Sequence, residues 1–425
     1  MSLPDSVLLR FPLLLLVLCT SCSVLAMAPE DAVHLLKRTG FGVTETEYQA
    51  MLPLSREEGV AQLVNGMKQL PVSRAPGFLP TDKNAGRNRG INAGRLTSWW
   101  LREMIRTPSP LTERMTLFWH GHFTSDIRKV NSALLMFRQN LLFRRLGTTR
   151  FDDLLHAVIR DGAMLKYLDN ANSRKADPNE NFARELLELF TLGEGNYEEQ
   201  DVVAAARSFA GWGVARDGGF LLRTGQVDSG TKRFLGVEKN FSPDDIVAEI
   251  LRGDTVGVFV VGALWTAFVS PDPVPAEVAR LATDFRQQGY DIKRLLKALF
   301  MTEAFWSSRD QLVRSPVELV VSSYRQLGAD LKPRQIRQQL AAMGQIPFRP
   351  PDVSGWPAGA DWLKGDWLLA RENFLSTLPL PDEPVVNENG ESFPRSARQT
   401  PGPEMPFTLQ PYTSVWLNSP LANLK

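Results

Sequence analysis

The sequence contains very little cysteine and histidine, with two Cys and four His in 425 residues. Both cysteines, Cys19 and Cys22, lie within the first 26 residues. If this segment is removed, the mature chain has no thiol, which excludes disulfide bonds, cysteine zinc sites and cysteine nucleophiles together. A chain of this length buries enough surface to fold without such cross-links.

The sequence also lacks an excess of charge of one sign, with 48 Lys and Arg against 47 Asp and Glu. A net charge near zero gives no general attraction to nucleic acid or anionic lipid, so any anion binding must be local. No G-x-S-x-G, H-E-x-x-H, P-loop or dinucleotide-binding pattern is present. The serine hydrolase and zincin classes, and a nucleotide or dinucleotide cofactor, therefore lose their main support.

The amino terminus has the pattern of a signal peptide. The apolar run FPLLLLVL at 11–18 follows Arg10, and small residues come after it, ending at Ala26. The run is too short for an ordinary membrane-spanning helix. We predict a signal peptide at 1–26, an exported periplasmic or secreted protein, and no integral membrane domain after cleavage. A lipoprotein attached through Cys22 and a retained anchor are the alternatives.

The remainder of the chain predicts a mainly α fold. Apolar residues recur at three- and four-residue spacing over 29–377, which indicates a single large helical domain. The segment 211–236 contains Asp-Gly-Gly between short apolar runs, so we predict a small β-hairpin insertion there. Nine prolines in the last 48 residues predict a Pro-rich, non-globular tail over 378–425.

The segment 109–123, SPLTERMTLFWHGHF, predicts an amphipathic helix. Ser109 can cap this helix and Pro110 suits its first position. At helical spacing Glu113 and His120 share one face of it.

A second histidine, His122, points to the apolar side if this helix continues. Gly121 can end the helix and let the imidazoles of His120 and His122 converge. Since neutral imidazoles are frequent metal ligands, we predict that both hold a divalent metal. The alternative is that His120 caps carbonyl groups and His122 is a hydrogen-bonded core residue.

The segment 177–193, DPNENFARELLELFTLG, predicts a second helix. Asp177 is the predicted N-cap, Glu180 completes a capping box, and Gly193 is placed to end the helix. Apolar side chains cover most of its circumference, and one polar stripe remains, formed by Asn181, Arg184, Glu185 and Glu188. Because unpaired buried charge is costly, the stripe must face water, a cleft, a metal or opposite charges.

We assign functional roles to this stripe as predictions. Glu185 is the third metal ligand, and Glu185 or Glu188 is an acid/base group with Arg184 beside it. Asn181 and Arg114 contact the substrate, and Arg184 or Arg114 orients an anionic group. The alternative is an exposed stripe with an Arg184–Glu188 ion pair of a few tenths of a kcal/mol.

The segment 348–362, FRPPDVSGWPAGADW, predicts a stiff irregular loop, because its prolines fix backbone angles and its glycines permit turns. Trp356 and Trp362 either pack in the core or line a site for a sugar or peptide, since indole offers a flat apolar face and one donor.

These segments together resemble the bacterial domain of unknown function 1800 family. The similar motifs are HLLKRTGFG from His34, PLTERMTLFWHGHF, YLDN, NENFARELLELFTLG, the segment 201–212, RSPVELV from Arg314, and PPDVSGWP. The resemblance covers nearly all of the chain before the tail. It implies export, a helical fold and an exported hydrolase-like partner protein, and it implies no mechanism.

The sequence departs from the family pattern at three places. It has Val227-Asp228 where the family usually has His-Asp, Gly253-Asp254 where the family tends to have His-Pro, and Gly121 where the family has Asn. If Val227 stands in place of a ligand, the resemblance implies weaker metal binding.

Two classes of function follow from these observations. The first is an exported metal-dependent hydrolase or oxidoreductase, in which the metal lowers the pKa of a bound water. The second is a non-enzymatic envelope scaffold that docks a partner or polymer through the Trp356 loop, the segment 71–94 and the tail.

Overall fold

The structure, a computed structural model, describes residues 26–76, 89–328 and 333–378 and the strand residues 385–386 and 392–393. These residues are mainly helical, as predicted. The helices up to residue 208 are α1 (Pro29–Thr39), α2 (Glu45–Met51), α3 (Arg56–Asn65), α4 (Arg89–Arg106), α5 (Pro110–His122), α6 (Ile127–Val130), α7 (Ala133–Leu146), α8 (Phe151–Val158), α9 (Gly162–Tyr167), α10 (Glu180–Glu188) and α11 (Glu199–Ser208). The later ones are α12 (Pro243–Arg252), α13 (Thr255–Phe268), α14 (Pro275–Gln287), α15 (Ile292–Phe300), α16 (Glu303–Ser307), α17 (Pro316–Leu327), α18 (Pro333–Ala342) and α19 (Gly365–Ser376). Short 3-10 helices cover Asn170–Asn172, Thr224–Gln226 and Gly359–Leu363.

The predicted signal peptide lies outside the described residues except for Ala26. The predicted tail lies outside them except for Leu378 and two short paired strands, β5 (Val385–Val386) and β6 (Ser392–Phe393).

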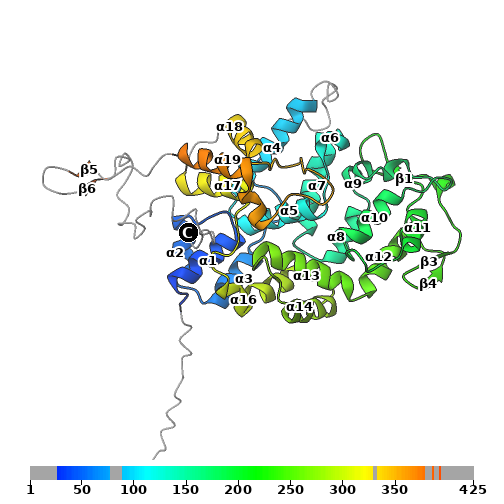
Figure 1. The fold of residues 1–425 in the computed structure, drawn as a ribbon, viewed down its shortest axis with the longest axis horizontal. Coiled ribbons are helices and arrows are strands. Elements are labelled where there is room, and N and C mark those ends of the chain that lie inside the picture. Colours follow the sequence, from blue (N-terminus) through cyan, green and yellow to red (C-terminus); the bar gives the residue numbers. More distant parts are fainter. Residues whose placement is uncertain (1–25, 77–88, 329–332, 379–384, 387–391, 394–425) are drawn as a thin grey trace, which may run out of the picture.

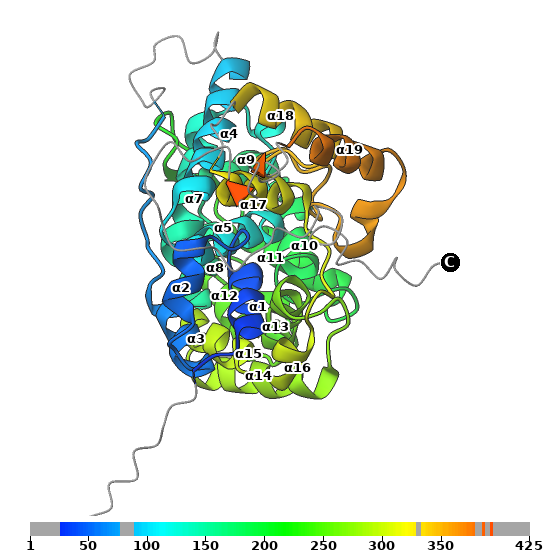
Figure 2. The ribbon, with the colours of Figure 1, turned by 90° about the vertical axis from the view of Figure 1, so that its left-hand side faces the viewer.

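Helix α5 lies in the middle of the fold (Figure 1) and packs against α1, α4 and α7. On one side of it, α3 packs against α15 although the two are far apart in the sequence. Figure 2 shows α18 and α19 at the same end of the molecule as α4, and α18 packs against both. The carboxyl-terminal helices therefore close over the amino-terminal ones.

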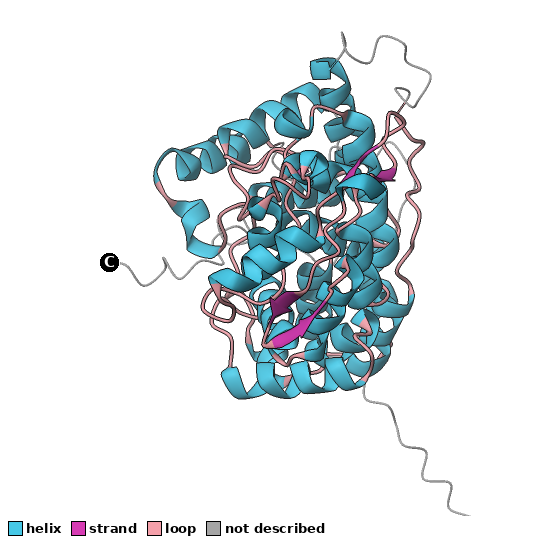
Figure 3. Ribbon diagram, turned by 90° about the vertical axis from the view of Figure 1, so that its right-hand side faces the viewer, coloured by secondary structure: helices cyan, strands magenta, loops and turns pink. Residues whose placement is uncertain are grey.

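The predicted hairpin is confirmed at β1 (Trp212–Val214) and β2 (Phe220–Leu222), which pair antiparallel with Trp212 opposite Leu222. A second hairpin, of β3 (Lys232–Phe234) and β4 (Val237–Lys239), follows it. Figure 3 shows the strands as small elements beside the helical body.

The buried apolar side chains form one continuous cluster that extends from Met27 to Phe374. One shared core holds α1 and α19 in the same body, as a single helical domain requires. In the part of the chain that the structure describes, no helix combines the length and the apolar character needed to cross a membrane.

The ends of α10 differ from the prediction. The N-cap is Asn179, whose Oδ1 accepts a hydrogen bond from Phe182 N at 3.0 Å, because Asp177 is held in a turn with Arg174. The helix ends at Glu188, well before Gly193. Gly193 has a φ of +81° and belongs to the turn that follows.

Helix α17 begins with a capping box that fixes one acidic side chain. The Glu318 carboxylate accepts a hydrogen bond from Ser315 N at 2.6 Å, and the Ser315 hydroxyl caps the N–H of Glu318. This reciprocal pair holds Glu318 at the start of the helix, where it reaches the cavity described below.

Candidate functional site

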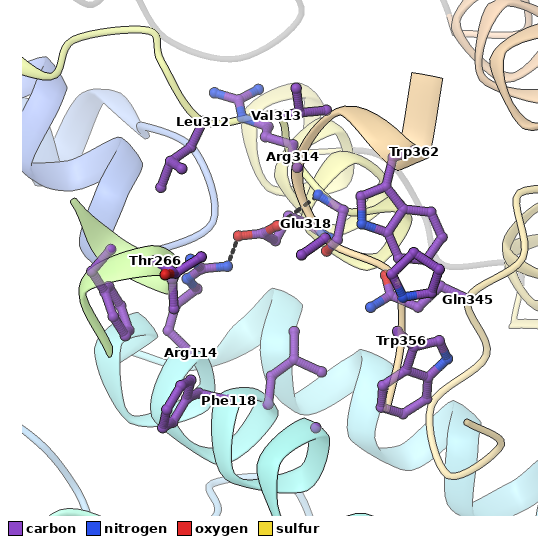
Figure 4. A pocket seen from close by; sticks show the side chains of 18 of the residues that line it. Arg114, Phe118, Thr266, Leu312, Val313, Arg314, Glu318, Gln345, Trp356 and Trp362 are labelled. Atoms are coloured by element: carbon purple, nitrogen blue, oxygen red, sulfur yellow. Dashed lines mark hydrogen bonds and ion pairs between the residues drawn. The ribbon is translucent and has the colours of Figure 1, made fainter. Parts of the chain in front are cut away.

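A cavity of about 550 Å³ lies among α1, α5, α13, α17 and α19. Figure 4 shows Arg114 and Glu318 on one side of it and the indole rings of Trp356 and Trp362 on the other. Its walls come from parts of the chain as distant as His34 and Arg371. A concave site of this size falls in the range that holds small molecules.

The cavity is lined by more cations than carboxylates. The cationic residues are Lys37 and Arg38 on α1, Arg114 on α5, Arg314 just before α17, and Arg371 on α19. The carboxylates among its described lining residues are Asp310 and Glu318. Because charge removed from water is most stable beside opposite charge, the described lining residues favour a negatively charged group in this cavity.

Two of the cavity's arginines are held by main-chain carbonyl groups, and a third is ion-paired. Arg38 Nη2 donates to Ser308 O at 2.7 Å, and Arg371 Nη1 donates to the carbonyl of Arg314 at 2.9 Å. Arg114 forms an ion pair with Glu318, while its Nε has no hydrogen-bond partner within the described ranges. Carbonyl oxygens satisfy donors but leave the positive charge in place.

Burial and mutual repulsion lower the pKa values of these side chains. The pKa of Arg114 falls to about 9, first through burial and then through the charges of Arg38 and Arg314. Burial, followed by the charge of Arg314, lowers the pKa of Arg371 to about 10. Both groups stay protonated near neutral pH, so the cavity remains cationic there.

Aromatic rings also line the cavity. Phe118 and Phe268 lie near Arg114, whose guanidinium carbon is 5.3 Å from the Phe268 ring centroid. Trp356 lies in the irregular part of the segment 348–362, and Trp362 lies in the 3-10 helix Gly359–Leu363 at its end, where the prediction of a loop was wrong. Both residues line the cavity. The cavity therefore offers charge to one part of a ligand and flat apolar surface to another.

The two predicted metal ligands of α5 point in different directions, because the helix continues through Gly121 to His122. The prediction that Gly121 ends the helix is therefore wrong. His120 is 1% exposed and packs against Trp100, Phe348 and Trp356. His122 lines the cavity instead.

Each imidazole forms a hydrogen bond with a main-chain group. His120 Nε2 accepts from Phe348 N at 3.0 Å, and His122 Nε2 donates to Phe190 O at 2.9 Å, since a carbonyl can only accept. Burial lowers the pKa of His120 to about 3 and that of His122 to about 4. Both rings are therefore neutral at pH 7, and metal binding through Nε2 would require breaking these bonds.

The structure places the polar stripe of α10 partly in solvent, as its alternative interpretation expected. Arg184 pairs with Glu199 and Glu180 rather than with Glu188, so the predicted Arg184–Glu188 pair is wrong. Glu188 accepts from Tyr197 Oη at 2.6 Å.

The other two members of the stripe make few contacts. Asn181 donates weakly to Leu168 O at 3.5 Å, and Glu185 is half-buried. Burial and the charge of Glu188 raise the pKa of Glu185. In the described part of the chain no group of three His, Cys, Asp or Glu could hold a metal ion. The metal site of His120, His122 and Glu185 thus stays a prediction.

The cavity brings together four of the residues proposed from sequence, Arg114, His122, Trp356 and Trp362. The predicted residues that are not among its described lining residues are His120, Asn181, Arg184, Glu185 and Glu188. The sequence interpretation did not predict that Arg38 and Arg314 line a cavity, although both lie in family-like motifs, LLKRTGFG and RSPVELV. Arg371 has no local signal in the sequence.

Two of the three departures from the family pattern lie away from the cavity lining, since no described lining residue comes from 190–262. Asp228, next to Val227, pairs with Arg207 at 2.8 Å. Gly253 is the C-cap of α12.

These features define a class of protein, a helical domain with a cavity lined by cationic and aromatic side chains. The chain belongs to the family described as protein of unknown function (DUF1800), whose model matches residues 34–415. This confirms the resemblance seen in the sequence. No curated protein and no solved structure matches the chain.

Proposed function

We propose that this protein binds a small anionic molecule in the cavity lined by Arg38, Arg114, Arg314 and Arg371. The excess of cationic side chains over carboxylates among the described lining residues supports the proposal most strongly. A carboxylate, sulfate or phosphate would replace the missing negative charge, and guanidinium groups suit the planar or tetrahedral oxygens of these anions. The ligand would then also reduce the repulsion among the arginines.

The test substitutes each partner of the Arg114–Glu318 ion pair, which Figure 4 shows. Arg114→Gln removes a cation, and the affinity for inorganic sulfate should fall about 10- to 100-fold, which corresponds to a charge-assisted hydrogen bond of about 1.5–3 kcal/mol. Glu318→Gln removes a competing carboxylate and keeps the capping box, so the affinity should rise about tenfold. Isothermal titration calorimetry at constant ionic strength measures both.

The matched control is Arg294→Gln on α15, whose side chain is 65% exposed. It should leave sulfate affinity unchanged. Equal affinities of the wild type and both cavity variants would contradict the proposal, and so would absence of sulfate binding to the wild type.

We also propose export, supported by the signal-peptide pattern at 1–26. Expression in a bacterial host with a functional secretion pathway should yield a chain that begins at Met27, as read by intact mass and amino-terminal sequencing. Met27 is buried and its N–H donates to Leu54 O at 2.7 Å, so the new terminus would lie against the folded body. A mature chain that retains Met1, or one that carries lipid on Cys22, would contradict cleavage after Ala26.

A hydrolase or oxidoreductase dependent on a divalent metal has no ligand cluster to support it in the described residues. Binding of a small anion is compatible with a second role as an envelope scaffold. It is also compatible with action beside an exported hydrolase-like partner.

A further inference from the structure

The aromatic side of the cavity is a rigid wall. Trp362 is 2% exposed and its ring packs against that of Trp367, with centroids 5.3 Å apart. The Trp356 ring packs against His120, with centroids 5.4 Å apart. Each indole is therefore held from the protein side while both contribute to the cavity surface (Figure 4).

A buried amide lies between these indoles in Figure 4 and lines the cavity. This is Gln345, which is 5% exposed. Its Oε1 accepts from Val317 N at 2.8 Å, and this bond fixes which end of the amide is the nitrogen. The amide's bond with a described residue is the one at Oε1, so its Nε2 is a hydrogen-bond donor on the cavity wall beside the part-exposed ring of Trp356.

We infer that the anionic ligand is a saccharide that carries an acidic group, an inference that depends on the anion-binding function proposed above. A pyranose ring has apolar C–H faces that fit indole, and hydroxyl oxygens that accept from Gln345. Its carboxylate, sulfate or phosphate lies toward Arg114 and Arg314. An acid with a purely apolar body would contact the same aromatic wall but would leave the Gln345 amide without a hydrogen-bond acceptor, which is unfavourable.

The arginines and the aromatic wall line the same cavity. We therefore expect one ligand to contact both of them. The volume of about 550 Å³ exceeds what a single small oxyanion needs and lies in the range of ordinary ligand sites. The arginines alone account for the anion, and the wall of Trp356, Trp362 and Gln345 accounts for the remainder of the ligand.

Calorimetry with the mature chain and a matched set of probes tests the inference. D-glucuronate should bind at least tenfold more tightly than acetate, cyclohexanecarboxylate or D-glucose. D-glucose 6-sulfate and D-glucose 6-phosphate, each compared with its free anion, identify which acidic group is preferred. Gln345→Met should lower the affinity for glucuronate about tenfold and leave that for acetate unchanged.

The outcomes separate the two proposals. If glucuronate binds no more tightly than acetate, or cyclohexanecarboxylate binds equally well, the saccharide inference is wrong while anion binding stands. If no probe with a negative charge binds, anion binding fails and the saccharide inference fails with it. The comparison of probes on the wild type remains decisive even if the Gln345→Met chain does not fold.

Discussion

Replacing Arg144 by Met should lower the free energy of unfolding by about 3–5 kcal/mol, because it leaves a buried carboxylate without its cation. Arg144 and Glu113 are 0% and 1% exposed. The guanidinium donates two hydrogen bonds of 2.8 Å to Glu113 and one of 2.7 Å to Asn140. Trp100 Nε1 also donates to Glu113 at 2.8 Å.

This pair also matters for the cavity. Glu113 and Arg114 are consecutive on α5, and the bonds of Glu113 to α7 and α4 fix the rotation of the helix about its axis. Arg114 then lies on the face of α5 that lines the cavity. We therefore expect Arg144→Met to weaken anion binding as well as stability.

Urea denaturation followed by circular dichroism measures the effect. The control is Arg145→Met, one residue along α7 on its exposed face, which should change stability by less than about 0.5 kcal/mol. The double variant Glu113→Leu with Arg144→Met should recover much of the loss, since neither charge then remains unpaired. A single Arg144→Met variant as stable as Arg145→Met would show that the pair contributes nothing.

Lowering the pH from 7 to 5 should destabilise the protein by several kcal/mol, because the two buried histidines and the half-buried His122 resist protonation. The pKa of His34 is lowered to about 4 by burial and by Arg38, that of His120 to about 3 by burial, and that of His122 to about 4 by burial. The unfolded chain takes up these protons below about pH 6.5 and the native state does not. Each histidine then costs about 2 kcal/mol at pH 5.

One buried acid acts in the opposite direction. Burial raises the pKa of Asp161 to about 6, so protonation of the native state there recovers about 1 kcal/mol at pH 5. The histidines outnumber it, and the net change is a loss. Urea denaturation at pH 7, 6 and 5 measures the slope.

Two variants assign the slope to the histidines. His120→Gln keeps an acceptor for Phe348 N and removes one titrating group, so its dependence on pH should be shallower. His122→Gln removes a second titrating group, so its dependence on pH should also be shallower. Stability that is constant or rises between pH 7 and 5 would contradict the buried, neutral state of these rings.

The sequence predicted much of the fold because helix signals are local. Ser109 and Pro110 located the start of α5, and helical spacing correctly placed Glu113 and His120 on one face, where both contact Trp100. The N-cap of α10 was misplaced because Asp177 and Asn179 are both good capping residues. Only the tertiary turn at Arg174 shows that Asn179 is used.

The cavity could be predicted only in part. Arg114 and Trp356 stood out because a motif and a Trp-bearing loop surround them. Arg38 and Arg371 are more than 300 residues apart, and a single arginine on a helix is usually a solvated charge. Both line the cavity because α19 packs against α18 and Arg371 reaches the carbonyl of Arg314 just before α17, which no local pattern encodes. The predicted helix end at Gly121 was wrong for a related reason, since glycine permits a helix end but does not require one.

The most direct test of the central claim is anomalous diffraction from crystals of the mature protein soaked in low millimolar selenate. The proposed anion site predicts a selenium peak inside the cavity, within hydrogen-bond distance of the Arg114 guanidinium and of at least one other of its arginines. Peaks confined to the protein surface, with none in the cavity, would contradict it.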